Sequence, residues 1–514
     1  MPNSDVLIIG AGHNGLVAAI RLARAGLRVR VLERAQQVGG ACRTEYPFAR
    51  APEVGQSTGA YLLGLMPPEI MAELGVSFPL IRRDPHYFLP TTGSRFLLLG
   101  ADPAAVDRQI ADVFSEADAR ANRRLQDELA ALCKDLAPSW LSAPLSLEDT
   151  AERFVRPALR EHFVSLCAGS VSDYLERFGF QSELLESMYA VTDGLTGLSG
   201  DATSAGSGTN FWVHNMCRLP GSNGTWMIVR GGMGTVTQRL LEVAERAGVQ
   251  VELETTAVAI ETKAGAASGA VTADGRVYRA AAVVSNTDPF RLRQMLGDGC
   301  PQDLARRIAG YAIEGHSMKV NLCLRALPEF SCLPEDRGQH GATIHLLPEH
   351  NTKARLRQAY RDCAAGQLPE DPSVEWYVHT TLDPSLQDAQ GRHSAALFVQ
   401  WVPYALEGGH WADHESKYVR YLLEICDRFA PGTSDLVVDT HVLTPPKIES
   451  HFGIAGGHIH HVDHRFAFDA RLPYDLPVNG LYACGAGCHP AGSVIGAAGY
   501  NAATTILGDF SISS

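Results

Sequence analysis

The sequence has no excess of positive charge. Its 44 Lys and Arg residues face 57 Asp and Glu residues, and the formal net charge is -13 at pH 7. This balance argues against a nucleic-acid partner and against docking on an anionic membrane through a basic patch. A weak apolar contact with a membrane surface stays open, and so does a homodimer.

Long apolar runs are also missing. No stretch reaches the roughly 20 apolar residues that a membrane-spanning helix needs. The opening residues, MPNSDVLIIG, enter an apolar run without a basic start. We therefore expect no secretory signal and a cytoplasmic protein that is at most peripheral to a membrane.

Paired cysteines are lacking as well. The 11 cysteines are an odd number, and no two of them form a CxxC motif. Cys484 and Cys488 lie among glycines, with three residues between them. We expect reduced, mostly buried thiols in a reducing compartment rather than disulfides or a redox pair.

The chain is long enough for more than one hydrophobic core. It has 514 residues, 45% of them hydrophobic and 20% charged, and a single core rarely grows beyond about 300 residues. We expect two interleaved domains. Residues 1–80, 225–290 and 445–514 would form a nucleotide-binding domain. Residues 81–224, mainly helical, and 291–444 would form a substrate domain.

The chain opens with a strand, a glycine-rich turn, a helix and a second strand. Residues 5–10 (DVLIIG) are continuously apolar, as in a strand buried on both faces. A helix is expected over residues 14–25, ending before Gly26, and the next strand (RVRVLE) ends at Glu33. This order predicts a βαβ unit with parallel strands.

Later segments predict further strands. Residues 235–261 predict a helix, a stop at Gly248 and a pair of strands, and residues 269–286 predict a hairpin followed by a buried strand. The runs MKVNLCLRAL, residues 318–327, and SAALFVQWV, residues 394–402, are also strand-like.

The turn after the first strand reads GAGHNG and places Gly10, Gly12 and Gly15 in a GxGxxG pattern. The first glycine allows the tight turn, the second lets backbone approach a pyrophosphate, and the third lets the helix pack closely. The anion would lie at the helix N-terminus. Glu33 follows 18 residues after Gly15. It would bind a ribose hydroxyl and repel the 2′-phosphate of NADP.

A second glycine turn follows at once. Gly39 and Gly40 lie shortly after Glu33, with Arg34 before them and Arg43 after them. A nicotinamide dehydrogenase has no need of this turn, whereas a flavin nucleotide has a ribityl chain and a ring system to bury. We expect both arginines and both glycines to contact such a cofactor. The alternative for Arg43 is a surface cation.

Near the end of the chain, GLYACGAGCHPAGSVIGAAGYNAA (residues 480–503) has side chains too small to fill a core. With the two glycine turns, this run resembles the FAD-dependent phytoene desaturase and carotenoid isomerase superfamily. The likeness is greatest to its phytoene-dehydrogenase-related branch of pyridine nucleotide-disulfide oxidoreductase domain proteins. Flavin amine oxidases are more distant relatives. The middle segment VRGGMGTVTQRLLEVAERAGVQVELETTAVAI also carries the resemblance.

The resemblance implies FAD as cofactor and an α/β fold. A Rossmann-like, amine-oxidase-like FAD-binding domain would carry an interleaved α+β substrate domain. Gly492, Gly496 and Gly499 would leave space where backbone passes the flavin, and the helix that follows would point its N-terminus at the ring. Further cofactor contacts implied by the resemblance are Gly232, Met233, Val258, Gly485, Pro490, Ser493 and Val494.

Two side chains are candidates for catalysis. The resemblance implies that His489 lies at the flavin edge, either as a proton donor or as a residue that starts the last helix. Flavin amine oxidases carry a lysine, bridged by water to flavin N5, in a strand comparable to that of Lys319. A lysine within an apolar strand needs a reason, because burying a charge is costly. The alternative is a solvated lysine on an edge strand.

The segment GGHIHHVDH brings His458, His460, His461 and His464 together. A zinc site needs a closing set of ligands with orienting partners. The sequence supplies none, so we expect no metal and a polar loop near the flavin.

Some apolar and aromatic residues have two interpretations. The aromatic side chains either line a substrate cavity or belong to the core. The apolar segment 60–80 either touches a membrane or is buried between the domains. The aromatic residues concerned are Trp212, Trp226, Trp401 and Tyr404.

The implied function is an FAD-dependent oxidoreductase acting on an apolar, unsaturated substrate of carotenoid or isoprenoid type. Hydride would move to flavin N5, in a desaturation or an isomerisation. One alternative is a flavin amine oxidase producing hydrogen peroxide, which an aromatic cage around the flavin, with Lys319 reaching N5 through water, would favour. Another is a non-catalytic flavoprotein that binds partners, which a filled cavity would favour. A long apolar tunnel would favour the polyene substrate.

Overall fold

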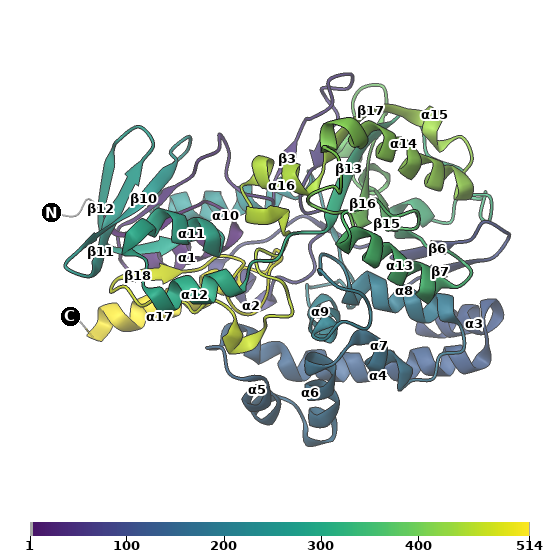
Figure 1. Ribbon diagram of the computed structural model, residues 1–514, viewed down its shortest axis with the longest axis horizontal. Helices are drawn as coiled ribbons and strands as arrows, with labels where there is room; N and C mark the ends of the chain where they lie inside the picture. Colours follow the sequence, from purple (N-terminus) through teal and green to yellow (C-terminus); the bar gives the residue numbers. More distant parts are fainter. Residues whose placement is uncertain (1–3, 513–514) are drawn as a thin grey trace.

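The computed structural model describes residues 4–512 as two large sheets with helices packed around them (Figure 1). The first sheet has the strand order β10-β11-β12-β1-β2-β9, with β18 paired to β12. Its strands are β1 (Ser4–Ile9), β2 (Val29–Leu32), β9 (Gln250–Glu252), β10 (Ala257–Lys263), β11 (Ala266–Thr272), β12 (Val277–Ser285) and β18 (Leu481–Ala483).

The centre of this sheet is parallel, as the βαβ pattern predicts. β1 lies between β2 and β12 and is parallel to both. Helix α1 (His13–Arg24) connects β1 to β2 and packs against α10 (Gly234–Arg246) and α17 (Ala497–Ile512). The apolar residues of β1 are almost fully buried, because helices cover the sheet.

The segment after α10 differs from the prediction of a strand pair. β9 pairs with β2, whereas β10 pairs with β11, so the two strands lie at opposite ends of the sheet order. β9 and β10 are adjacent in the sequence but do not pair with each other, because β9 completes the parallel sheet beside β2. The hairpin between β11 and β12 turns at Gly275, as predicted.

The second sheet has the order β17-β13-β16-β15-β14-β6-β7. Successive side chains along each strand point to opposite faces of the sheet, one facing an apolar core and the other a cavity. Val320, Leu397 and Trp376 belong to an apolar cluster that includes the inner face of α14 (Trp411–Phe429). Their neighbours on the opposite face line the cavity described below. The strands are β6 (Tyr87–Pro90), β7 (Phe96–Leu99), β13 (Ser317–Leu324), β14 (Thr343–Leu346), β15 (Ser373–Val378), β16 (His393–Gln400) and β17 (Val437–Leu443).

The segment predicted to be mainly helical is helical, and it lies beneath the second sheet in Figure 1. Several of its helices begin after an Asp or Ser whose side chain caps the first turn, for example Ser115 before α4. The helices are α3 (Pro103–Val113), α4 (Glu116–Leu136), α5 (Leu147–Phe154), α6 (Arg160–Ala168), α7 (Val171–Glu176), α8 (Glu183–Gly194) and α9 (Ser207–His214).

All strands of the first sheet fall within the ranges predicted for the FAD-binding domain, and those of the second within the substrate ranges. The domain boundaries stay a prediction. The apolar segment 60–80 is part of the core, since Leu63, Met66 and Ile70 are fully buried. A weak contact with a membrane stays a prediction. Among the described helices, none is long and apolar enough to cross one.

Candidate functional site

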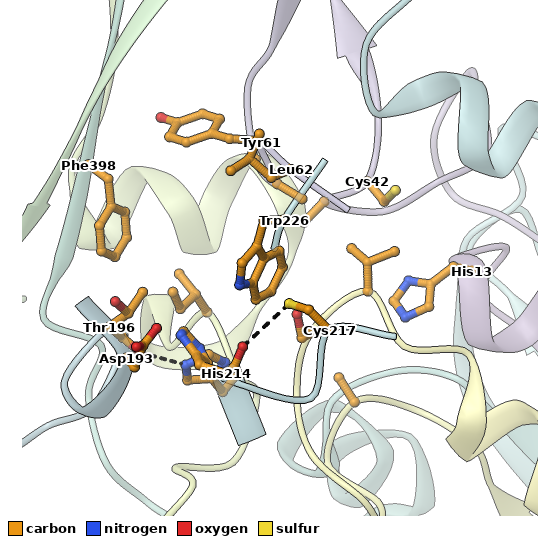
Figure 2. Close-up of a pocket in the computed structure, with 18 of the residues that line it drawn as sticks. His13, Cys42, Tyr61, Leu62, Asp193, Thr196, His214, Cys217, Trp226 and Phe398 are labelled. Carbon is orange, nitrogen blue, oxygen red and sulfur yellow. Dashed lines mark hydrogen bonds between the residues drawn. The ribbon is translucent and has the colours of Figure 1, made fainter. Parts of the chain in front are cut away.

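A large cavity runs from the glycine turn of the first sheet to one face of the second sheet. Its volume is 1510 Å³, above the roughly 300–1,000 Å³ of ordinary small-ligand sites. Figure 2 shows the rings of Tyr61 and Phe398 on one side of this space and Asp193 and His214 on the other. Trp226 lies between them, with its ring centroid 5.7 Å from that of His214. The volume is large enough for a dinucleotide and a second ligand.

The first end of the cavity is built for an anion. Gly10, Gly12, Gly39 and Gly40 line it. Helix α1 starts there with Gly12 as N-cap, with no side-chain cap and no acidic residue in its first turn. The first N–H groups of a helix lack partners within the helix. They therefore suit a pyrophosphate.

Glu33 is held in a fixed orientation at the end of β2. Its Oε2 accepts a hydrogen bond from the Ala11 N–H at 2.8 Å, and its Oε1 accepts one from the Ala35 N–H at 2.9 Å. The carboxylate also lines the cavity. Its remaining lone pairs can accept hydrogen bonds from ribose hydroxyls.

Two arginines add positive charge near Glu33. Arg34 and Arg291 both line the cavity. Burial, followed by repulsion from Arg291, lowers the pKa of Arg34. Such crowding of like charges is relieved by a bound anion. Arg43, in contrast, does not line the cavity, because its Nε lies 3.2 Å from Glu45 Oε1 and its guanidinium stacks on Phe452.

The third glycine of the first turn has a packing role. A Cβ on Gly15 would lie 2.4 Å from the Gly10 carbonyl oxygen, so only glycine lets α1 approach β1 this closely. Val258, Ser493 and Val494 line the cavity, as predicted cofactor contacts should.

Gly232 and Met233 lie behind the second glycine turn instead of facing the cavity. A Cβ on Gly232 would lie 2.3 Å from Thr44 Oγ1, and the Met233 N–H donates to Ser57 Oγ at 2.9 Å. They hold the backbone after Gly40 in place. Gly485 likewise packs on protein, since its Cβ would lie 2.6 Å from the Thr287 carbonyl oxygen.

The small residues near the C-terminus make close contacts within the chain. A Cβ on Gly492 would lie 2.2 Å from the His460 carbonyl oxygen, and one on Gly499 would lie 1.9 Å from that of Asn14. At Gly496 the nearest atoms are side-chain atoms of the core. The close contacts explain Gly492 and Gly499, and a φ of +82° explains Gly496. That the flavin passes beside these residues stays a prediction. Helix α17 starts only at Ala497.

His489 and Pro490 are buried outside the cavity lining. His489 Nε2 lies 3.0 Å from the carbonyl oxygen of Ser139, and burial lowers the pKa of the imidazole to about 4. The catalytic role of His489 stays a prediction, and its position favours the alternative. A neutral ring tied to Ser139 matches the alternative of a structural residue.

The second end of the cavity is a row of side chains across four adjacent strands. The row runs across β13, β16, β15 and β14, in that order. Its members, each opposite the next in the strand register, are Lys319, Phe398, Glu375 and His345. Lys319, Phe398 and Glu375 line the cavity. Residues at one register position share a face of the sheet.

Lys319 is buried, with a 7% exposed fraction. Its Nζ lies 4.0 Å from the ring centroid of Tyr61 and 4.7 Å from that of Phe398. Burial lowers its pKa to about 7, and the charge of Glu375 acts in the opposite direction. Since β13 lies between β16 and β17, the alternative of a solvated edge-strand lysine is wrong.

Two buried carboxyl groups face the same space. Glu375 accepts hydrogen bonds from the Tyr377 hydroxyl and from Thr196 Oγ1. Burial raises the pKa of Glu375 to about 7, and that of Asp193 on α8 likewise to about 7. Sequence reasoning missed both, although a glutamate inside SVEWYV poses the same problem as Lys319 does in its strand.

Arg83 is a second buried cation in the cavity wall. It is 4% exposed. Its Nε donates to the Trp226 carbonyl oxygen at 2.9 Å, and its Nη1 donates to Thr343 Oγ1 at 2.8 Å. Burial lowers the pKa of Arg83 only to about 10, so it stays charged at neutral pH.

A family model described as flavin-containing amine oxidoreductase matches residues 15–328. The chain belongs to this family. A mouse protein, pyridine nucleotide-disulfide oxidoreductase domain-containing protein 2, is 32% identical, over 99% of this chain and 94% of the mouse one. Hydroxyneurosporene desaturase of Cereibacter sphaeroides is 27% identical, over 98% and 97%. Putrescine oxidase bound to putrescine shares the fold, with a TM-score of 0.59, 17% identity and 99% coverage of both chains.

The protein is therefore an FAD-dependent oxidoreductase of the amine oxidase and desaturase superfamily, with the fold that its motifs predicted. The residues present fit FAD. The free N–H groups at the start of α1 suit the pyrophosphate, and Glu33 suits the ribose. Arg34 and Arg291 add the positive charge.

The histidine segment of this flavoprotein forms a loop, not a strand. His458 Nε2 lies 3.2 Å from Asp463 Oδ2, and burial lowers the pKa of His461 to about 3. His460 and His461 line the cavity. Within residues 4–512, no group of three or more His, Cys, Asp or Glu side chains is arranged to hold a metal.

The four aromatic candidates differ in whether they line the cavity. Trp226 lines the cavity, whereas Trp212, Trp401 and Tyr404 do not. Trp401 is fully buried and donates from Nε1 to the Gly200 carbonyl oxygen at 2.9 Å. All the cysteines are free thiols, and burial raises the pKa of Cys488 to about 12.

Proposed function

We propose that this flavoprotein oxidises a C–H bond of an unsaturated, isoprenoid-like substrate, in a desaturation or as the first step of an isomerisation. The observation that carries the proposal is the position of Lys319. Its ammonium group lies between the rings of Tyr61 and Phe398, where an aromatic cage would otherwise hold a substrate amine. FAD, when bound, supplies the hydride acceptor.

The charges around this cage also disfavour an amine. Arg83 stays charged at neutral pH, and Lys319 has a pKa of about 7. An ammonium ion brought next to them would be repelled. A neutral or anionic substrate meets no such barrier. The name of a relative, hydroxyneurosporene desaturase, also supports chemistry on a polyene.

A desaturation releases a proton together with each hydride, and a nearby base must take it. Glu375 is suited to this task. Its pKa of about 7 means that both protonation states are accessible near neutral pH. The Tyr377 hydroxyl orients its carboxyl group. Tyr61 and Phe398 provide apolar walls for the body of the substrate.

A flavin amine oxidase is the second candidate. The carboxyl groups of Glu375 and Asp193, when ionised, would attract a substrate ammonium, and the fold is shared with putrescine oxidase. The second-sheet end of the cavity contains ionisable side chains (Arg83, Lys319, Glu375) beside its apolar walls, so it is not a wholly apolar tunnel. Its volume of 1510 Å³ argues against the non-catalytic alternative, which requires a filled cavity.

The test is the visible absorption of the FAD-loaded protein, recorded without oxygen before and after adding dispersed polyenes, isoprenoids and, separately, amines. We expect bleaching by a member of the isoprenoid panel and none by the amines. Bleaching by amines alone would replace the proposal with the oxidase alternative. If nothing in the panel bleaches the flavin, net desaturation of these compounds is excluded, and isomer analysis with pre-reduced flavin follows.

A further inference from the structure

The second end of the cavity contains two buried basic side chains that form no ion pair within residues 4–512. Arg83 and Lys319 are 4% and 7% exposed. Of the ion pairs formed by residues 4–512, none involves either side chain. A buried charge is costly unless it is paired and hydrogen-bonded. Both side chains line the cavity, so a ligand can supply the missing partner.

We propose that the substrate carries a carboxylate, which Arg83 and Lys319 hold at the second-sheet end of the cavity. The inference rests on the proposed function, because it names the chemical class of the same substrate. The charges of Lys319 and Arg83 both act on Glu375, so the two groups face the same part of the cavity. A guanidinium and an ammonium form charge-assisted hydrogen bonds with a carboxylate, and these are stronger than neutral ones.

The donors needed for this contact are free. Arg83 uses Nε and Nη1 for the Trp226 carbonyl and the Thr343 hydroxyl. A guanidinium has five N–H donors, so its Nη2 remains available. In the part of the chain that the structure describes, Lys319 Nζ has ring contacts with Tyr61 and Phe398 and makes no hydrogen bond or ion pair. It can offer all of its N–H groups to a ligand.

The two carboxyl groups in the cavity do not replace the ligand. Glu375 already accepts the hydroxyls of Tyr377 and Thr196, and it lies across Phe398 from Lys319 in the strand register. Asp193 lies on α8, opposite the sheet. Burial favours the neutral form of both acids. With pKa values of about 7, both acids are only partly ionised near neutral pH, which reduces their repulsion of a bound anion.

The space beside the two cations suits an apolar chain. Tyr61, Leu62, Trp226, Phe398 and Ile459 all line it. A ligand with one anionic end and an unsaturated hydrocarbon body would pair the cations and cover these apolar walls together. An isoprenoid acid combines both properties.

The experiment compares three probes that share a hydrocarbon chain and differ in their head group. Farnesoate is anionic near neutral pH, farnesol is neutral and farnesylamine is cationic. Binding to the FAD-loaded protein is measured by calorimetry. We expect farnesoate to bind at least about tenfold more tightly than farnesol, and farnesylamine to bind most weakly. Equal or weaker binding of farnesoate would overturn the proposal.

The variants Arg83→Gln and Lys319→Met show whether the two cations cause the preference. Each is expected to weaken farnesoate binding about tenfold or more and to leave farnesol binding nearly unchanged. Arg95→Gln and Lys417→Met remove the same charges from exposed positions outside the cavity lining, and serve as matched controls. Flavin absorption and melting temperature confirm that each variant is folded. Equal losses for both probes would indicate a purely structural role and contradict the proposal.

Bleaching of the flavin separates this proposal from the proposed function. If farnesoate binds through the two cations but no isoprenoid bleaches the flavin, the carboxylate site stands and the oxidation fails. If neutral isoprenoids bind and bleach as well as farnesoate, the oxidation stands and the carboxylate site fails.

Discussion

At the scale of single residues, burial determines the charges in the cavity. Lys319 and Glu375 share one register row, and burial shifts the pKa of each toward its neutral form, to about 7. The two groups thus titrate in the same range, although their usual values lie far apart. A site with such perturbed groups is typical of catalysis or ligand binding.

Glu375→Gln is expected to change how stability depends on pH. The pKa of Glu375 is raised from 4.5 to about 7, so between these pH values the native state binds more protons than the unfolded state. Its contribution to stability is present below pH 4.5 and is lost as pH rises to about 7. The glutamine variant has no carboxyl group here and does not lose this stability as pH rises. It should therefore gain about 3 kcal/mol relative to the wild type between acidic and mildly alkaline pH.

Melting temperature as a function of pH checks this prediction. Glu370→Gln, which changes an exposed glutamate just before β15, is the matched control and should follow the wild-type profile. Parallel profiles for Glu375→Gln and the wild type would mean that Glu375 is ionised in the native state at low pH.

At the scale of elements, the packing of α17 on α1 depends on small residues. The backbone of Gly499 approaches Asn14 so closely that no side chain fits between them. This contact lies beside the helix N-terminus that faces the cavity. The glycine-rich end of the chain thus positions the cofactor site from behind.

Gly499→Ala is expected to destabilise the protein by about 1–3 kcal/mol, because the helices must move apart to admit a methyl group. Gly508→Ala, in the same helix, meets no atom within 4 Å and should be neutral or stabilising by up to about 1 kcal/mol. Thermal unfolding of the two variants provides the comparison. Equal melting temperatures would contradict the close packing of α1 and α17.

At the scale of the whole molecule, the cavity joins the two sheets. Its lining includes the glycine turn after β1, the cage of Tyr61 and Phe398, and residues of α4 and α8. A cofactor bound across such a space stabilises the native state, because the unfolded chain does not bind it. The gain is about 2.7 kcal/mol when the free cofactor is at 100 times its Kd.

Gly12→Val is expected to abolish FAD binding while leaving the fold intact. Gly12 has an ordinary backbone conformation, and a Cβ there would meet only the flexible Asn286 side chain, at 3.2 Å. The purified variant should be colourless and melt at the temperature of FAD-stripped wild-type protein, whether or not FAD is added. Gly15→Ala, whose Cβ would strike the Gly10 backbone, should lose the fold itself. A yellow Gly12→Val protein would place the pyrophosphate elsewhere.

The sequence by itself determined the elements whose signals are local. The apolar run of β1, the GxGxxG turn, Glu33 and the hairpin at Gly275 depend on residues adjacent in the chain, and their spacing predicts them directly. The family and the FAD cofactor follow from the same motifs.

Only the tertiary structure decided which distant side chains meet. Lys319 and Glu375 face one cavity because their strands, β13 and β15, both pair with β16. Arg83, in the segment before β6, lines the same cavity. The same non-local packing places His489 against Ser139 and Gly499 against Asn14. Strand register and helix packing depend on contacts between segments far apart in the chain, which short sequence patterns do not encode.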